Sequence, residues 1–291
     1  MGNKGYFFYC LCIFTYMTTF HPVDMIEEVD VVLKRQHGRH KHGEIKLFVF
    51  GDSYVDTGNW PKSMSSSWKQ PYGFTYPGYP SGRFSDGLVL TDFIEEEQVY
   101  NKEKMSSSIA IVSVAGNDYA TFITNNNMED LVNVTKSMLS QLELNLRRIH
   151  GLGVQKIGIT TMEPIGCLPK LTITSSYENC SEYANSISMF HNQMLHQIID
   201  KLNNQTSKPN FFIIDLYNAF MTSLNIQQNH PGNSNFENPL KPCCMGICGD
   251  KKKYVLCKNP EFSFFWDAIH PSQQGWFAVF SALKPSLSFL L

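Results

Sequence analysis

Apolar positions along this chain follow two different spacings. Short runs that are almost wholly apolar are typical of buried strands, and they cover residues 45–50, 109–115, 156–162 and 211–216. Apolar residues spaced three and four apart predict helices, which cover residues 88–100, 128–150, the stretch from Ser181 to about 202, and the end after Pro271. Strands that alternate with such helices form a parallel sheet covered on both faces. The sequence therefore predicts an α/β protein: a three-layer α/β/α sandwich with a mostly parallel central sheet, in one domain over residues 45–291.

Two long segments show neither spacing. Residues 60–87 are rich in Pro, Gly, Ser and aromatic side chains, and residues 225–262 form a polar loop rich in Pro and Cys. Long loops in a compact domain are often functional. The first loop leaves the end of the first strand, so it could wall a cleft there. Its aromatic side chains could contact substrate or pack beneath the loop, and the sequence leaves both possibilities open.

The N-terminal segment carries an apolar run behind Lys4. The run covers residues 6–20, which is short for a bilayer span but has the length of a signal-peptide core. Residues 1–22 are therefore predicted to be a secretory signal, with a retained apolar segment as the alternative, and no stable membrane span is expected. Residues 23–44 contain charged residues and several histidines without apolar neighbours to fix them, which indicates a flexible lead-in rather than a metal site.

Composition narrows the function. The 291 residues are 43% hydrophobic and 17% charged with a net charge of -2, so nucleic acid is not an expected partner. No cofactor or metal is expected. Without the predicted signal, six cysteines remain and should form disulfides in a secreted protein: Cys167, Cys180, Cys243, Cys244, Cys248 and Cys257. A zinc site on the last four is the alternative, although the spacing lacks Cys-x-x-Cys pairs. Sequons at Asn133, Asn179 and Asn204 agree with secretion.

Candidate chemistry lies at the ends of the predicted strands. Ser53 follows Gly51 and Asp52 directly after the first strand, at the edge of an open α/β sheet where ligands bind. Far downstream, Asp267 and His270 are three residues apart, a spacing that lets the carboxylate orient the imidazole. Each feature also has a structural interpretation, as a polar turn at Ser53 and a surface hydrogen bond at Asp267. His191 and His196 lie on a predicted amphipathic helix and are interpreted as structural.

Several motifs together resemble the plant form of the GDSL esterase/lipase family, in the SGNH hydrolase superfamily. They are Gly51-Asp52-Ser53, Gly82-Arg83-Phe84-Ser85-Asp86-Gly87, Gly116-Asn117-Asp118 and Asp267-Ala268-Ile269-His270. The resemblance implies a flavodoxin-like sheet of strand order 2-1-3-4-5. It also implies a catalytic Ser53, His270 and Asp267, with the Ser53 N–H and the Asn117 side-chain amide as oxyanion-hole donors. For Asn117 the structural alternative is an Asx turn. The predicted function is a secreted serine esterase or lipase acting on small carboxylic esters, such as acyl lipids or acetylated glycans.

One block of the family pattern is missing from this chain. Between residue 87 and the strand at residue 109, no Asn-Phe-Ala-x-Gly-Gly-like stretch occurs, although the family places there an edge strand and a glycine that donates the third oxyanion hydrogen bond. The sheet is therefore predicted to lack one edge strand. The alternative function is that of a catalytically weak or inactive family member, acting as a binding protein or a vestigial product.

Overall fold

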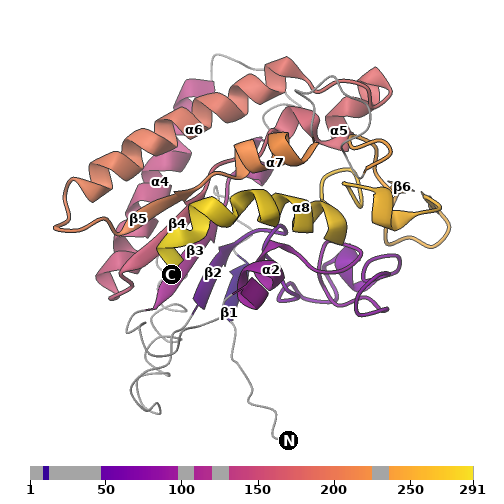
Figure 1. Ribbon diagram of the computed structural model, residues 1–291, viewed down its shortest axis with the longest axis horizontal. Coiled ribbons are helices and arrows are strands. Elements are labelled where there is room, and N and C mark those ends of the chain that lie inside the picture. Colours follow the sequence, from indigo (N-terminus) through magenta and orange to yellow (C-terminus); the bar gives the residue numbers. More distant parts are fainter. Residues whose placement is uncertain (1–8, 13–46, 98–107, 120–130, 225–235, 291) are drawn as a thin grey trace, which may run out of the picture.

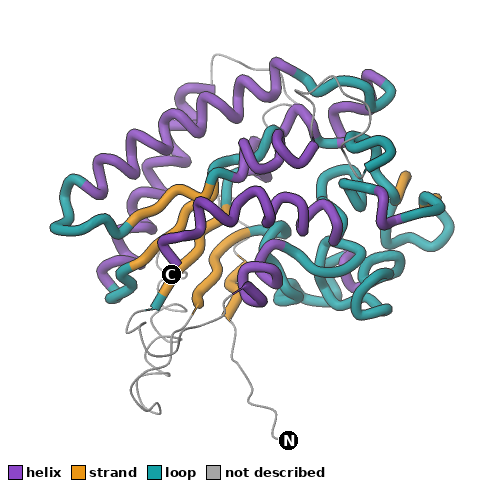
Figure 2. Tube along the Cα trace, viewed as in Figure 1, coloured by secondary structure: helices purple, strands orange, loops and turns teal. Residues whose placement is uncertain are grey.

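A parallel sheet lies between two layers of helices in the computed structural model, which describes residues 9–12, 47–97, 108–119, 131–224 and 236–290 (Figures 1 and 2). The sheet has five strands in the order β1-β2-β3-β4-β5. Their bounds are β1 Tyr9–Cys12, β2 Leu47–Gly51, β3 Ile109–Ser113, β4 Lys156–Thr160 and β5 Phe211–Ile214. All neighbouring pairs are parallel. The predicted α/β/α sandwich is confirmed, but the strands follow their order in the sequence and not the order 2-1-3-4-5 that the family resemblance implies.

Alternation along the strands divides the apolar side chains between two cores. Leu47 and Val49 of β2 belong to the core that also contains α2 (Leu90–Glu97), α7 (Leu216–Leu224) and α8 (Gln273–Leu283). Phe48 and Phe50 belong to the opposite core, with α4 (Leu131–Gly151) and α6 (Glu182–Asn203). Because successive side chains of a strand point to opposite faces, a buried strand must be apolar at every position. This explains the continuous apolar runs of the sequence.

Serine side chains begin two of the long helices. Ser181 accepts a hydrogen bond from the backbone N–H of Ala184 at the start of α6, and Ser272 accepts one from Gly275 at the start of α8. These side chains satisfy N–H groups that have no partner inside the helix.

The remaining described elements are short: α5 Pro169–Thr172, β6 Cys244–Gly246, β7 Tyr254–Leu256, and the 3₁₀ segments Ser66–Trp68, Ile165–Cys167, Ile173–Ser175, Pro260–Phe262 and Lys284–Leu290.

Several predicted segments differ from the structure: β3 and β4 each end two residues before the predicted strands 109–115 and 156–162 do. The sequence predicts a strand up to residue 216, but β5 ends at Ile214 and helix α7 begins at Leu216. Asp215 interrupts the strand because its carboxylate accepts a hydrogen bond from the backbone N–H of Asn218, as an N-cap does. In the predicted loop 225–262, β6 and β7 pair as an antiparallel two-stranded sheet. Residues 225–235 of that loop lie outside the described part of the chain.

The edge of the sheet next to β2 is occupied by β1. The sequence predicts that an edge strand is missing, whereas Tyr9–Cys12 pairs in parallel with residues Phe48 to Gly51. An unpaired edge of β2 would leave backbone N–H and C=O groups without partners, and an extended apolar segment can supply them. Residues 9–12 lie within the segment 1–22 that the sequence assigns to a signal peptide. That assignment and the division of the chain into residues 1–22, 23–44 and 45–291 stay predictions.

In the described part of the chain, no helix has the length and apolar character needed to cross a membrane.

Three disulfides confirm the prediction that the six cysteines are cross-linked, and the structure identifies the pairs. They join Cys167 to Cys180, Cys243 to Cys257 and Cys244 to Cys248. The alternative of a zinc site on the last four is therefore wrong. The backbone N–H groups of Cys243 and Cys244 donate to the carbonyls of Phe265 and Trp266, at 3.0 and 2.7 Å. The cross-linked loop thus supports the segment immediately before Asp267.

Candidate active site

Ser53 lies in a tight turn at the carboxyl end of β2. A side chain on Gly51 would come within 2.4 Å of Val55 and 2.5 Å of the Ser113 carbonyl oxygen, so only glycine allows the turn to pack this closely. The carboxylate of Asp52 accepts a hydrogen bond from the backbone N–H of Tyr54 at 3.1 Å. The polar-turn interpretation therefore applies to Asp52, while the hydroxyl of Ser53 has a different partner.

A continuous chain of hydrogen bonds joins the three predicted catalytic side chains. Ser53 Oγ lies 2.7 Å from Nε2 of His270. Nδ1 of the same imidazole lies 2.9 Å from both carboxylate oxygens of Asp267. All three residues are buried, each with no more than 8% of its surface exposed. The fold thus brings Ser53 and His270, which are 217 positions apart in the sequence, within hydrogen-bonding distance.

The carboxylate of Asp267 is held by further donors. Its Oδ1 accepts hydrogen bonds from the backbone N–H groups of Ile269 and His270, both at 2.8 Å. Its Oδ2 accepts one from the hydroxyl of Tyr72 at 2.8 Å. Burial opposes ionisation, but the charge and hydrogen bonds of His270 outweigh it, so the pKa of Asp267 lies below its usual value. The carboxylate is therefore ionised and fixed in orientation.

Tyr72 is a hydrogen-bond partner of Asp267 that the sequence does not single out. It is one of several aromatic residues in the 60–87 loop, and no spacing distinguishes it from Tyr76 or Tyr79, which are exposed, whereas Tyr72 is only 4% exposed. The closing of this loop over Asp267 brings the hydroxyl to the carboxylate. Residues 72 and 267 are 195 positions apart, so only the folded chain identifies the contact.

We expect Tyr72→Phe to lower kcat by about tenfold, because it removes one donor to the ionised Asp267. Hydrogen bonds to charged groups contribute about 1.5–3 kcal/mol, and a tenfold change in rate corresponds to about 1.4 kcal/mol. Steady-state kinetics on a soluble ester would measure the change. Tyr79→Phe removes a hydroxyl from an exposed residue of the same loop and serves as the control. Equal kcat values for Tyr72→Phe and the parent would contradict this role.

The 60–87 loop also covers the imidazole. The ring of Phe84 stacks on that of His270 with centroids 4.7 Å apart. Arg83 fixes this part of the loop to α2 through a pair of hydrogen bonds to Asp92, at 2.8 and 2.7 Å. The prediction that the loop walls the site is confirmed for Tyr72 and Phe84. Phe74, in contrast, is 57% exposed.

Asn117 lies at the carboxyl end of β3, next to the strand that leads to Ser53. Gly51 pairs with Ser113 at the ends of the two strands. Between Ser113 and Asn117, Ala115 adopts a φ of 104°, an uncommon value for a residue with a side chain and one often associated with functional sites. The side chain of Asn117 is exposed. Its role as an oxyanion-hole donor stays a prediction.

The two helical histidines lie away from this chain of hydrogen bonds. His191 is buried, its Nδ1 lies 3.1 Å from the hydroxyl of Tyr119, and burial lowers its pKa to about 4. His196 is exposed. The contact of His191 with Tyr119 agrees with the structural interpretation of that residue.

The chain is similar to known proteins over most of its length. The family model described as GDSL-like Lipase/Acylhydrolase matches residues 95–283. GDSL esterase/lipase At5g03610 from Arabidopsis thaliana is 38% identical over 350 residues, covering 97% of this chain and 96% of the relative. GDSL esterase/lipase At3g09930 from the same plant is 39% identical, covering 83% of this chain and 88% of the relative. Among solved structures, an acetyl xylan esterase from Geobacillus stearothermophilus matches 85% of this chain and 96% of its own, with a TM-score of 0.44 and 14% identity.

The first of these alignments is longer than the chain itself. It extends over 350 residues, whereas the chain has 291. The relative therefore has residues within the aligned region that have no counterpart here, as the predicted missing block requires. The family model nevertheless matches more than half of the chain, and the sequence identity extends over nearly all of it. The chain therefore belongs to the GDSL-like lipase/acylhydrolase family and is a carboxylic ester hydrolase.

Proposed function

We propose that the protein is a secreted serine esterase that forms a covalent acyl intermediate on Ser53. The observation that carries the proposal is the buried chain of hydrogen bonds from Ser53 through His270 to Asp267. A serine hydroxyl is a weak nucleophile until a neighbouring base takes its proton, and an imidazole oriented by a carboxylate is such a base. The predicted signal peptide and the three disulfides support secretion.

The geometry supports a two-step reaction. Ser53 Oγ attacks the acyl carbon of the ester while Nε2 of His270 accepts the hydroxyl proton. The imidazolium, held by Asp267, then gives that proton to the leaving alcohol oxygen as the C–O bond breaks. Water next attacks the acyl carbon of the Ser53 ester, His270 accepts one of its protons and returns it to Ser53 Oγ, and the acid departs. The Ser53 N–H and the Asn117 amide would donate hydrogen bonds to the oxyanion in both steps.

A fluorophosphonate probe tests the nucleophile directly, because it reacts with serines activated in this way. We expect stoichiometric labelling of the purified protein, with the adduct on the peptide that contains Ser53. Prior treatment with a short-chain ester should slow the labelling. Labelling of a different serine, or competition that has no effect, would contradict the assignment.

Activity should fall as the pH decreases, because only a neutral imidazole can accept the proton of Ser53. The rate should fall as the solution becomes acidic, because a protonated imidazole has no lone pair left to take that proton. Asp267, with its lowered pKa, stays ionised over this range and does not limit the rate. The dependence of kcat/KM on pH measures this effect. A rate that is constant from mildly acidic to mildly alkaline pH would argue against His270 as the base.

The substrate class proposed is a small carboxylic ester, an acyl lipid or an acetylated glycan. The rival proposal is a catalytically weak or inactive family member that binds such molecules, and the missing block with its third oxyanion donor favours it. The same probe distinguishes the two proposals. Labelling of Ser53 with measurable turnover supports the esterase, whereas binding of an ester without labelling or turnover supports the rival.

A further inference from the structure

Asn117 lies in a single turn of backbone that runs from Ala115 to Tyr119. The backbone N–H groups of Asp118 and Tyr119 donate to the carbonyl oxygen of Ala115, at 3.2 and 3.4 Å. The side chain of Asn117 is exposed, so burial does not fix the direction of its amide. That direction therefore depends on the groups that hold the two ends of the turn.

Backbone and carboxyl contacts hold the start of the turn close to the nucleophile. The N–H of Asp52, the residue before Ser53, donates to the carbonyl oxygen of Ser113 at the end of β3, at 3.2 Å. A methyl group on Gly116 would come within 3.0 Å of Oε1 of Glu163, a buried residue that follows β4. These contacts precede residue 117 and leave the end of the turn to be held by other groups.

The side chain of Tyr119 holds the end of the turn. Its hydroxyl lies 2.7 Å from Oγ1 of Thr135 on α4 and 3.1 Å from Nδ1 of His191 on α6. The rings of Tyr119 and His191 meet edge to face, with centroids 5.4 Å apart. Tyr119 and Thr135 have no exposed surface, and His191 is 2% exposed. One buried hydroxyl thus joins the end of the turn to two long helices.

The hydrogens of these three groups can satisfy both bonds. Burial raises the pKa of Tyr119 and lowers the pKa of His191 to about 4, so both are uncharged near neutral pH. If Nδ1 of His191 carries a hydrogen, it donates to Tyr119, which then donates to Thr135. In the other tautomer, Thr135 donates to Tyr119, which donates to His191. The hydroxyl therefore gives one hydrogen bond and receives one in either case.

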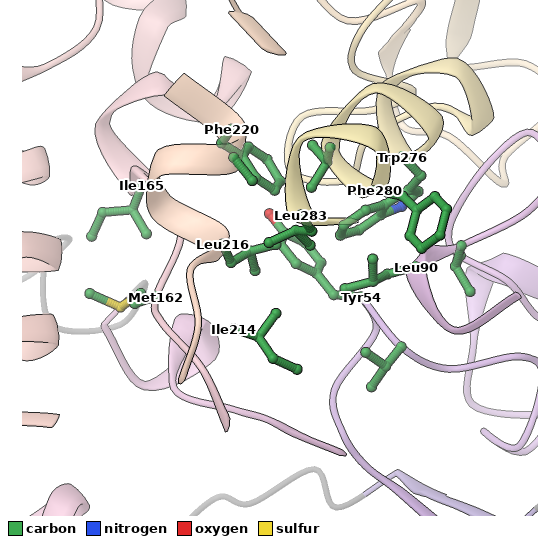
Figure 3. Packing of buried hydrophobic residues seen from close by; sticks show 14 of the residues in the cluster. Tyr54, Leu90, Met162, Ile165, Ile214, Leu216, Phe220, Trp276, Phe280 and Leu283 are labelled. Atoms are coloured by element: carbon green, nitrogen blue, oxygen red, sulfur yellow. The ribbon is translucent and has the colours of Figure 1, made fainter. Parts of the chain in front are cut away.

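The ring of Tyr119 belongs to the same apolar core as Tyr54, the residue after Ser53. Figure 3 shows part of this core, with Tyr54 beside Phe220 and Trp276. Close packing leaves little room for such side chains to move independently. The turns at the ends of β2 and β3 are therefore supported by one core.

We propose that Tyr119 is a positioning residue for ester hydrolysis: its hydroxyl, bonded to α4 and α6, fixes the end of the turn and so directs the Asn117 amide toward the oxyanion. The inference rests on the proposed function, because it assigns a support to the Asn117 donor of that reaction. The oxyanion develops only as the reaction proceeds, so a misdirected amide slows the reaction without weakening the binding of the ester.

Tyr119→Phe removes the hydroxyl and keeps the ring, so it tests the anchor directly. We expect kcat for p-nitrophenyl acetate to fall by about tenfold, with KM within about twofold of the parent, because the donor is displaced and not removed. Tyr183→Phe, at a tyrosine of α6 that is 43% exposed, is the matched control and should keep the kcat of the parent.

A double-mutant cycle separates a positioning role from a general structural one. Asn117→Ala alone should lower kcat by about 10²–10³-fold, the contribution of one oxyanion donor. When Tyr119→Phe is added to Asn117→Ala, we expect a further loss of no more than about twofold, because the amide that Tyr119 directs is then absent. A further loss of about tenfold in the double variant would overturn the inference, since Tyr119 would then act independently of Asn117.

His191 offers an independent test that leaves Tyr119 in place. In His191→Asn, the amide has a polar atom at the same position along the side chain as Nδ1 and can replace its hydrogen bond, whereas His191→Leu has none. We expect kcat to fall by about threefold in His191→Leu and to stay within about twofold of the parent in His191→Asn, since Thr135 still holds the hydroxyl in both. A His191→Leu variant as fast as the parent would refute this part of the anchor.

Loss of stability is controlled by a change at the opposite end of the sheet. Asn203→Ala removes hydrogen bonds to the backbone of Asn210 and Phe211, where β5 begins, and should lower the Tm while kcat stays that of the parent. If Asn203→Ala lost as much kcat as Tyr119→Phe at a similar Tm, the effect would be one of stability and the inference would be wrong.

Two outcomes distinguish the inference from the function on which it rests. A parent without turnover, or an Asn117→Ala variant with the kcat of the parent, contradicts the proposed function and the inference with it. A slow Asn117→Ala beside a Tyr119→Phe with the kcat of the parent contradicts only the role of Tyr119.

Discussion

Ser53→Ala is expected to lower kcat for p-nitrophenyl acetate by about 10⁴-fold or more. Removal of a serine nucleophile leaves only the rate enhancement from binding and oxyanion stabilisation, and known losses for such a change reach about 10⁶. The hydroxyl of Ser53 is the group that meets Nε2 of His270 at 2.7 Å, and no substrate bond can form once it is absent. The fold should persist, because the change removes one oxygen from a small side chain at a turn.

Two measurements make this result specific. Ser63→Ala, at an exposed serine of the 60–87 loop, should retain the activity of the parent. Thermal unfolding of both variants should match that of the parent, which separates loss of the nucleophile from loss of structure. Turnover by purified Ser53→Ala equal to that of the parent would refute the assignment of the nucleophile.

The second large effect concerns the missing block. Insertion of the corresponding strand and glycine loop from a relative such as GDSL esterase/lipase At5g03610 is expected to raise kcat by about 10²–10³-fold, the contribution of one oxyanion donor. A further gain of about a hundredfold is expected if the block also corrects a displacement of about 1 Å at the reacting centre. An insertion between Glu95 and Glu97 would interrupt helix α2. The block should therefore be inserted after Glu97, where this helix ends.

A matched graft isolates the donor from the strand. In the control, proline replaces the donor glycine of the inserted loop, because proline has no backbone N–H to give. The complete graft should be faster than this control on the same short-chain ester. No gain in a folded graft, or full activity in the chain without it, would mean that other groups complete the oxyanion hole.

The inserted strand would have to pair at the edge of β2, which β1 now occupies. Whether the inserted strand can pair there depends on whether residues 1–22 are still part of the protein. If residues 1–22 are removed as a signal peptide, β1 leaves with them and the edge of β2 is free for the graft. Sequencing the N-terminus of the protein secreted from plant cells would establish which form is present.

Local features of the sequence were sufficient for strands β2 to β5, for the long helices and for the choice of three candidate site residues. The strand runs are apolar at every position because both faces are buried, and that requirement is visible in any stretch of a few residues. Asp267 and His270 could be paired from the sequence because they lie in the same turn, where the backbone N–H of His270 reaches the carboxylate. Ser53 could be placed because a glycine turn directly follows a strand.

The tertiary structure alone decided which distant groups support those residues. Tyr72 donates to Asp267 across 195 positions, and Tyr54 donates to Ile269 across 215. The placement of Tyr9–Cys12 at the edge of the sheet is also a contact between distant segments. Such contacts leave no periodic pattern, because each depends on how a loop closes over the sheet and not on the spacing of neighbouring residues. Burial acts in the same way: Glu163 is an ordinary acidic residue in the sequence, and only the surrounding protein, which removes water from its carboxyl, raises its pKa.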